Sequence, residues 1–111
     1  MTYQIASYSP IHKQEVMDIF KSNCPKYFCM KEFAEFEQYL DSLADENFLI
    51  IKCNDTILGC GGHYVNHDKK CIGIAWVMFK RYQLRLSNFL RLSQLFFETI
   101  IEKIKSHQLI I

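Results

Sequence analysis

The chain has no apolar run approaching the roughly 18 residues that a membrane-spanning helix requires. Its N-terminus, MTYQIASYS, lacks the basic-then-apolar order of a secretory signal peptide. Internal repeats, low-complexity segments and linker-like stretches are also absent. These absences predict a cytoplasmic protein with no membrane partner. The 111 residues, half of them hydrophobic, suffice for one domain, expected to span residues 1–111, but not for two.

No acidic residue occurs between Lys69 and Phe97. Up to Asp68 the chain carries ten acids and five bases, whereas from Lys69 onward it carries eight bases and two acids. The formal net charge of +1 therefore hides two halves of opposite sign. This asymmetry predicts two surfaces with different electrostatic tasks, the basic one suited to phosphate or another polyanion.

The five cysteines are an odd number in a chain without a secretion signal. They are predicted to be reduced thiols that pack as small apolar residues. Side chains of the type that zinc prefers occur close together at Cys60, His63, His67 and Cys71. Because side chains alternate along a strand, Cys60 and His63 would point to opposite faces of a sheet. No metal site is therefore predicted.

The hydrophobic pattern changes period along the chain and predicts a mixture of strands and helices. In order, the predicted elements are a strand at Tyr3–Ser7, a helix opened by Ser9 and Pro10 that ends before Pro25, a helix at about Lys31–Leu43, strands at Phe48–Cys53, Thr56–Asn66 and Cys71–Phe79, and a helix at about Asn88–His107. Leu109–Ile111 is expected to begin a further strand. Short polar turns join the three central strands and predict an antiparallel meander. The expected fold class is α+β, a mostly antiparallel mixed sheet flanked by helices.

Each predicted helix carries one apolar stripe at helical spacing. The stripes are Val16, Ile19, Phe20 and Asn23, then Phe33, Phe36, Leu40 and Leu43, then Phe89, Leu92, Phe96, Ile100 and Ile104. The opposite face of the second helix is acidic, with Glu32, Glu35, Glu37, Asp41 and Asp45. Two interpretations of that face stay open: it attracts a cationic amine, or it is an ordinary solvated helix face.

The glycines of LGCGGHY, which are Gly59, Gly61 and Gly62, do not form a phosphate loop, since no Lys-Ser/Thr follows and no helix begins there. Glycines within a strand indicate either close packing over the sheet or the approach of a ligand. The stretch KRYQLRLSN precedes the long helix, and helix starts expose N–H groups that bind anions. It is read either as an anion site or as an ordinary cap at Ser87 or Asn88 with solvated arginines.

The segment WVMFKRYQLRLSNFL, which follows the LGCGGHYVN and CIGIAW strands, resembles the GNAT superfamily of acyl-CoA-dependent N-acyltransferases. The order of the predicted elements from Tyr3 to Ile111 resembles that superfamily too. The resemblance implies that acetyl-CoA pairs with the strand Cys71–Phe79 and that loop amides wrap its pyrophosphate. The cofactor-binding residues that it implies are Val77, Met78, Phe79, Gln83, Leu84, Arg85, Leu86, Ser87 and Asn88.

The sequence departs from the superfamily's pattern at three small positions, which are Leu84, Leu86 and Asn88 here. Glycine permits positive φ and a close approach to phosphate, whereas a leucine forced into that geometry costs about 1–2 kcal/mol. The resemblance also implies that the rest of a fifth strand, another helix and two closing strands are lacking. The strand Cys71–Phe79 would then keep an exposed edge, through which a homodimer is expected to form.

Acyl transfer to an amine needs a base, an oxyanion donor and a tolerated leaving thiolate. The resemblance assigns the oxyanion to backbone N–H groups near Val77 to Phe79. Since Cys71–Phe79 contains no carboxylate or histidine, His63 is the candidate base, with a structural histidine as the alternative. The first function hypothesis is an enzyme that transfers an acetyl group from acetyl-CoA to an amine of a small molecule or protein. The second is a degenerate, non-catalytic GNAT-like remnant that acts by protein association or is inactive. No nucleic-acid partner is expected, because four basic residues at one helix start are too few.

Overall fold

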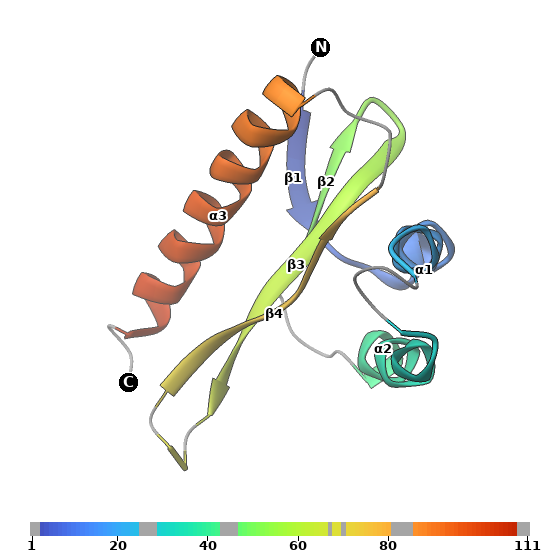
Figure 1. Ribbon diagram of the computed structural model, residues 1–111. Helices are drawn as coiled ribbons and strands as arrows, with labels where there is room; N and C mark the ends of the chain where they lie inside the picture. Colours follow the sequence, from blue (N-terminus) through green and yellow to red (C-terminus); the bar gives the residue numbers. More distant parts are fainter. Residues whose placement is uncertain are drawn as a thin grey trace.

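The computed structural model describes residues 3–24, 29–42, 47–66, 68–69, 71–80 and 86–108. Its strands are β1 (Tyr3–Ser7), β2 (Phe48–Cys53), β3 (Thr56–Asn66) and β4 (Cys71–Phe79). They form one sheet in the order β1-β2-β3-β4, with every neighbouring pair antiparallel. Helices α1 (Lys13–Ser22) and α2 (Lys31–Ser42) lie on one side of the sheet, and α3 (Leu86–Gln108) lies on the other (Figure 1). The predicted α+β class and the antiparallel meander are confirmed.

Two helix starts differ from the sequence prediction. A short 3-10 turn, η1 (Pro10–His12), precedes α1, because Nδ1 of His12 accepts a hydrogen bond from the Ser9 N–H at 3.1 Å and tightens this turn. Helix α3 begins at Leu86 rather than at Asn88, since leucine favours helix and neither proline nor glycine interrupts its first turn. None of the described helices is long and apolar enough to cross a membrane. The strand expected at Leu109–Ile111 lies outside the described residues.

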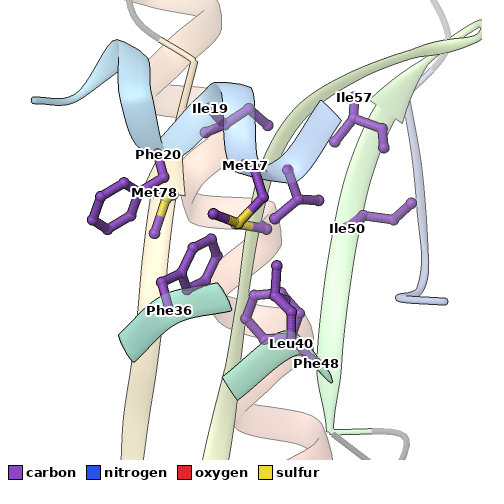
Figure 2. Packing of buried hydrophobic residues seen from close by; sticks show 11 residues of the cluster. Met17, Ile19, Phe20, Phe36, Leu40, Phe48, Ile50, Ile57 and Met78 are labelled. Atoms are coloured by element: carbon purple, nitrogen blue, oxygen red, sulfur yellow. The ribbon is translucent and has the colours of Figure 1, made fainter. Parts of the chain in front are cut away.

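The first hydrophobic cluster fills the space between the sheet and the helices α1 and α2 (Figure 2). Phe20 of α1 stacks on Phe36 of α2, with ring centroids 5.3 Å apart. Phe48 of β2 approaches Phe36 edge-on at 6.3 Å. The buried members are Val16, Met17, Ile19, Phe20, Phe36, Leu40, Phe48, Ile50, Ile57, Cys60 and Met78. The predicted stripes of the first two helices are confirmed by these residues, while Leu43 lies outside the described part.

The second hydrophobic cluster lies on the opposite face of the sheet, under α3. Its buried members are Leu49, Ile51, Cys53, Leu58, Leu92, Phe96 and Ile100. The predicted stripe of the long helix is thus confirmed at its three central residues, and Ile104 packs against them. Because β2 alternates between the two clusters, both of its faces are covered, which explains the continuous apolar run FLIIKC.

The β3–β4 hairpin projects beyond the other two strands (Figure 1). Strand β3 pairs with β2 from Thr56 to Gly62 and with β4 from Gly59 to Asn66, so the outer part of the hairpin extends past the end of the β2 pairing. Tyr64 lies over Gly73, its partner across the hairpin. On this hairpin Tyr64 and Ile74 are exposed, with 48% and 47% of their surface accessible to solvent. Strand β4 forms the outer edge of the described sheet.

Candidate functional site

The edge strand β4 contains an irregularity near its carboxyl end. Cys60 of β3 pairs with Met78, but Gly62 pairs with Ala75, so two residues of β4 lie opposite the single residue Gly61. The two residues are Trp76 and Val77, and Trp76 has a φ of 55°. This is a β-bulge, which bends a strand and redirects its side chains and backbone groups. The bulge therefore changes the shape of the outer edge of the sheet within the stretch to which the resemblance assigns thioester binding.

The bulge is held in place by packing on both faces. Toward the first cluster, the Trp76 indole lies 5.0 Å from the ring of Phe36 and 6.2 Å from that of Tyr39. The Sγ of Cys60 donates to the Trp76 carbonyl at 3.8 Å. Toward α3, Val77 packs in the second cluster. A left-handed conformation costs a residue with a Cβ about 1–2 kcal/mol, so these contacts offset a real strain at Trp76.

Beyond the bulge, the peptide unit between Phe79 and Lys80 ends the pairing with β3. The Lys80 N–H donates to the carbonyl of Leu58 at 2.8 Å. Because backbone groups of successive residues alternate in direction along an antiparallel strand, the N–H and C=O of Phe79 point away from β3. The Phe79 carbonyl accepts a hydrogen bond from Nδ2 of Asn23 at 2.9 Å. The backbone N–H and C=O of Phe79 therefore point to the outer edge of the sheet, two residues beyond the bulge.

The structure places six of the nine predicted cofactor-binding residues. Val77, Met78 and Phe79 lie in β4 from the bulge onward. The backbone of Leu86, Ser87 and Asn88 forms the first turn of α3, where N–H groups lack partners within the helix. The remaining three, Gln83, Leu84 and Arg85, lie outside the described residues.

At the N-terminus of α3, the expected strain of a left-handed leucine does not arise at Leu86, because this residue is α-helical. Ser87 and Asn88, the two residues that the sequence analysis considered as a cap, lie inside the helix instead of before it. No acidic residue occurs in this first turn, so nothing there opposes the positive end of the helix dipole. Whether the turn binds phosphate stays a prediction.

The strand glycines serve close packing, which was one of the two alternatives. A Cβ on Gly61 would lie 2.7 Å from Cγ2 of Val77 and 3.0 Å from Cε2 of Phe96. A Cβ on Gly62 would lie 2.2 Å from the backbone oxygen of Asn47. Neither glycine has a positive φ, so the lack of a side chain, rather than backbone freedom, is what these positions require.

His63, the candidate base, lies on β3 opposite Ile74. Its side chain is only 2% exposed, and its backbone N–H donates to the carbonyl of Asn47 at 3.3 Å. It is two residues beyond Gly61, which faces the bulge, and its burial agrees with the structural histidine that the sequence analysis kept as the alternative. Its role as a base stays a prediction.

The acidic face of α2 is partly neutralised by a cation from α1. Nζ of Lys13 lies 2.8 Å from Asp41 and 3.2 Å from Glu37. Hydrogen bonds to Asp41 and Glu37 raise the pKa of the Lys13 ammonium. Two carboxylates predicted to attract an amine therefore also join the two helices, while Asp45 lies outside the described residues.

No group of three or more His, Cys, Asp or Glu side chains among the described residues could hold a metal ion. Of the four residues considered for zinc, Cys60 packs in the first cluster. His67 lies outside the described part of the chain.

The thiols differ sharply in accessibility, and this leads to a first prediction. Cys24, Cys29, Cys53 and Cys60 form no disulfide bond, in agreement with the reduced thiols that the sequence predicts. Burial raises the pKa of Cys60, whereas Cys29 is exposed. Since the thiolate is the nucleophile, iodoacetamide at pH 8 should modify Cys29 at least about tenfold faster than Cys60. Peptide mass mapping over time measures both rates, and equal rates would contradict the described packing around Trp76.

Two features important to this site were missed in the sequence. The bulge at Trp76 leaves no local signal, because CIGIAWVMF reads as a regular strand. Asn23 was placed on the buried stripe of the first helix, but its bond to β4 was not foreseen. A polar side chain on an apolar stripe was the available signal, since buried polar groups need hydrogen-bond partners.

Comparison with known proteins supports one fold. No protein-family model and no curated protein sequence matches the chain. Among solved structures, an acetyltransferase of the GNAT family from Bacillus cereus ATCC 10987 is similar, with a TM-score of 0.59 and 12% sequence identity. The similarity covers 77% of this chain and 55% of that structure's chain. The chain therefore has a GNAT-like fold.

Proposed function

We propose that the chain binds an acyl-CoA thioester, acetyl-CoA in the first instance, along the outer edge of β4 and transfers its acyl group to an amine. The observation that carries the proposal is the bulge at Trp76 and Val77. It lies on an edge strand that leads to the N-terminus of a helix, in a chain with the fold of an acetyltransferase. A pantetheine arm resembles a peptide in its amide groups, so a strand edge is a suitable partner for it.

The reaction needs little from the side chains. The amine nitrogen attacks the thioester carbonyl, a C–N bond forms, and the C–S bond breaks. Backbone N–H groups in the stretch Val77 to Phe79 are the proposed donors to the tetrahedral oxyanion. An acceptor that is cationic in solution first loses one proton to solvent, which frees the lone pair that attacks. The proton lost by the nitrogen during the reaction goes to a base, for which His63 is the proposed residue, and the protonated base returns it to the departing thiolate, which leaves as the free thiol.

The proposed acceptor is a cationic amine of a small molecule or protein. The support is electrostatic, because α2 carries the exposed carboxylate of Glu35 as well as the paired carboxylates of Glu37 and Asp41. Such a surface raises the local concentration of cations and speeds their encounter with the protein.

A binding titration tests this proposal directly. Acetyl-CoA at one hundred times its Kd should raise the free energy of unfolding by about 2.7 kcal/mol, measured as an increase in Tm. Acetyl-CoA that lacks the 3′-phosphate is the matched control, and a smaller increase is expected with it. Release of free thiol in the presence of a polyamine then reports transfer. An unchanged Tm at millimolar acetyl-CoA would exclude useful binding.

A second candidate function is association with another copy of the chain through the edge of β4. The observation that favours it is the sequence of this strand, CIGIAWVMF, which carries neither a charge nor a proline, together with the exposed Ile74. Natural edge strands usually carry charged residues or proline, because these residues prevent the edges of two sheets from pairing. Light scattering after size exclusion separates the two functions, since a monomer that binds acetyl-CoA argues against the second.

A further inference from the structure

Asn23, which follows α1, is a polar side chain in an apolar setting. It is only 5% exposed. Its Nδ2 donates to the carbonyl of Ile19 at 2.8 Å, a local bond within the end of the helix. The same nitrogen donates to the carbonyl of Phe79, 56 positions away in the sequence, at 2.9 Å. The local bond would suffice to end a helix, so the distant bond needs another explanation.

The distant bond completes a clamp on one peptide unit. The carbonyl of Phe79 and the N–H of Lys80 belong to the same planar, trans group and therefore point in opposite directions. The N–H is held by the Leu58 carbonyl on β3, and the carbonyl is held by Asn23 from α1. With both ends fixed, this peptide has little freedom to rotate. The Phe79 N–H, which lies on the same edge as the clamped carbonyl, is oriented with it.

We propose that Asn23 is a positioning residue for acyl-CoA binding, because it fixes the backbone of β4 where the strand would meet the thioester arm. This inference rests on the proposed function. Asn23 does not touch the ligand itself; it acts through the peptide between Phe79 and Lys80. Preorganised donors bind and stabilise better than donors that must first be ordered.

Two variants separate this role from a merely structural one. In Asn23→Ser, the hydroxyl keeps a local bond to the preceding turn of α1 but is too short to reach Phe79. Asn23→Leu keeps the branched shape, with two bulkier methyl groups, and removes the side-chain N–H donors. The matched control is Glu15→Ala, which removes another bond from α1 to the sheet, from Oε2 of Glu15 to the Ile57 N–H at 3.1 Å. Ile57 precedes Leu58, which accepts the Lys80 N–H, so the control removes a bond from α1 to the sheet close to the clamp without touching the peptide between Phe79 and Lys80.

Two measurements on the full chain decide the question. Hydrogen exchange of the Lys80 amide should be about tenfold faster in both Asn23 variants than in the Glu15 control at equal global stability. Acetyl-CoA should bind about tenfold more weakly to the Asn23 variants and within about twofold of wild type to the control.

Each contrary result points to a different failure. Unchanged exchange at Lys80 would overturn the clamp itself. Faster exchange with unaltered acetyl-CoA affinity would overturn the positioning role. If wild type failed to bind acetyl-CoA, the proposed function and the role in binding would both fall, while the exchange data would still decide whether the clamp exists.

Discussion

Replacing Phe96 by alanine is expected to lower the free energy of unfolding by about 3–5 kcal/mol. The ring is fully buried between α3 and the sheet, and it meets Phe79 edge-on at 5.9 Å. The ring also lies close to Gly61, which has no side chain to move into the space that the ring would leave. A cavity that cannot collapse is costly. Urea unfolding followed by circular dichroism measures the change.

The matched control for this prediction is Phe97→Ala, one position further along the same helix. Phe97 is 37% exposed, so its removal should change the free energy of unfolding by no more than about 1 kcal/mol. Similar losses in the two variants would mean that α3 does not pack on the sheet by the face containing Phe96.

Replacing Gly62 by alanine is expected to cost about 3 kcal/mol. The new Cβ would lie 2.2 Å from the oxygen of Asn47 and 3.0 Å from Cα of Phe48. These are backbone atoms of β2 and of the residue just before it, and backbone atoms cannot rotate aside as a side chain can. The start of β2 would have to move away from β3, and the bond from the His63 N–H to the Asn47 carbonyl would lengthen. The fluorescence of Trp76, the chain's one tryptophan, reports unfolding.

Gly73→Ala is the contrasting variant on the partner strand. Its Cβ would meet the far end of the Tyr64 ring, which is 48% exposed and can move into solvent. The alanine also restricts the unfolded chain, which stabilises by about 0.4–1 kcal/mol and offsets part of the displacement. A near-neutral change is therefore expected. A loss as large as that of Gly62→Ala would show that side-chain displacement costs as much here as backbone displacement.

The elements of the fold could be predicted because each depends on neighbours in the sequence. The stripe Leu92, Phe96 and Ile100 recurs at helical spacing, and its burial follows from that spacing. The polar turn between β2 and β3, at Asn54 and Asp55, could also be predicted. Asparagine tolerates the left-handed conformation that Asn54 adopts there, with φ 55°. The start of α3 was less well predicted, because a serine or asparagine cap is only a weak preference.

The strand that carries three of the candidate residues was predictable, but its geometry was not. Val77, Met78 and Phe79 lie in β4 at the edge of the described sheet, and their role in cofactor binding stays a prediction. The bulge opposite Gly61 was not predictable, because a period of two tells which face a residue takes and not where the pairing slips. The burial of His63 could not be decided from the sequence for a similar reason, since it depends on what covers the hairpin.

By itself the sequence determined the order of strands and helices, the two apolar faces of the central strand β2 and the separation of acidic and basic halves. These properties are read from residues within a few positions of one another. Only the tertiary structure decided the left-handed Trp76, the space denied to a side chain at Gly62 and the bond from Asn23 to Phe79. Each of these depends on atoms that the chain brings together from distant segments, and local periodicity carries no information about such contacts.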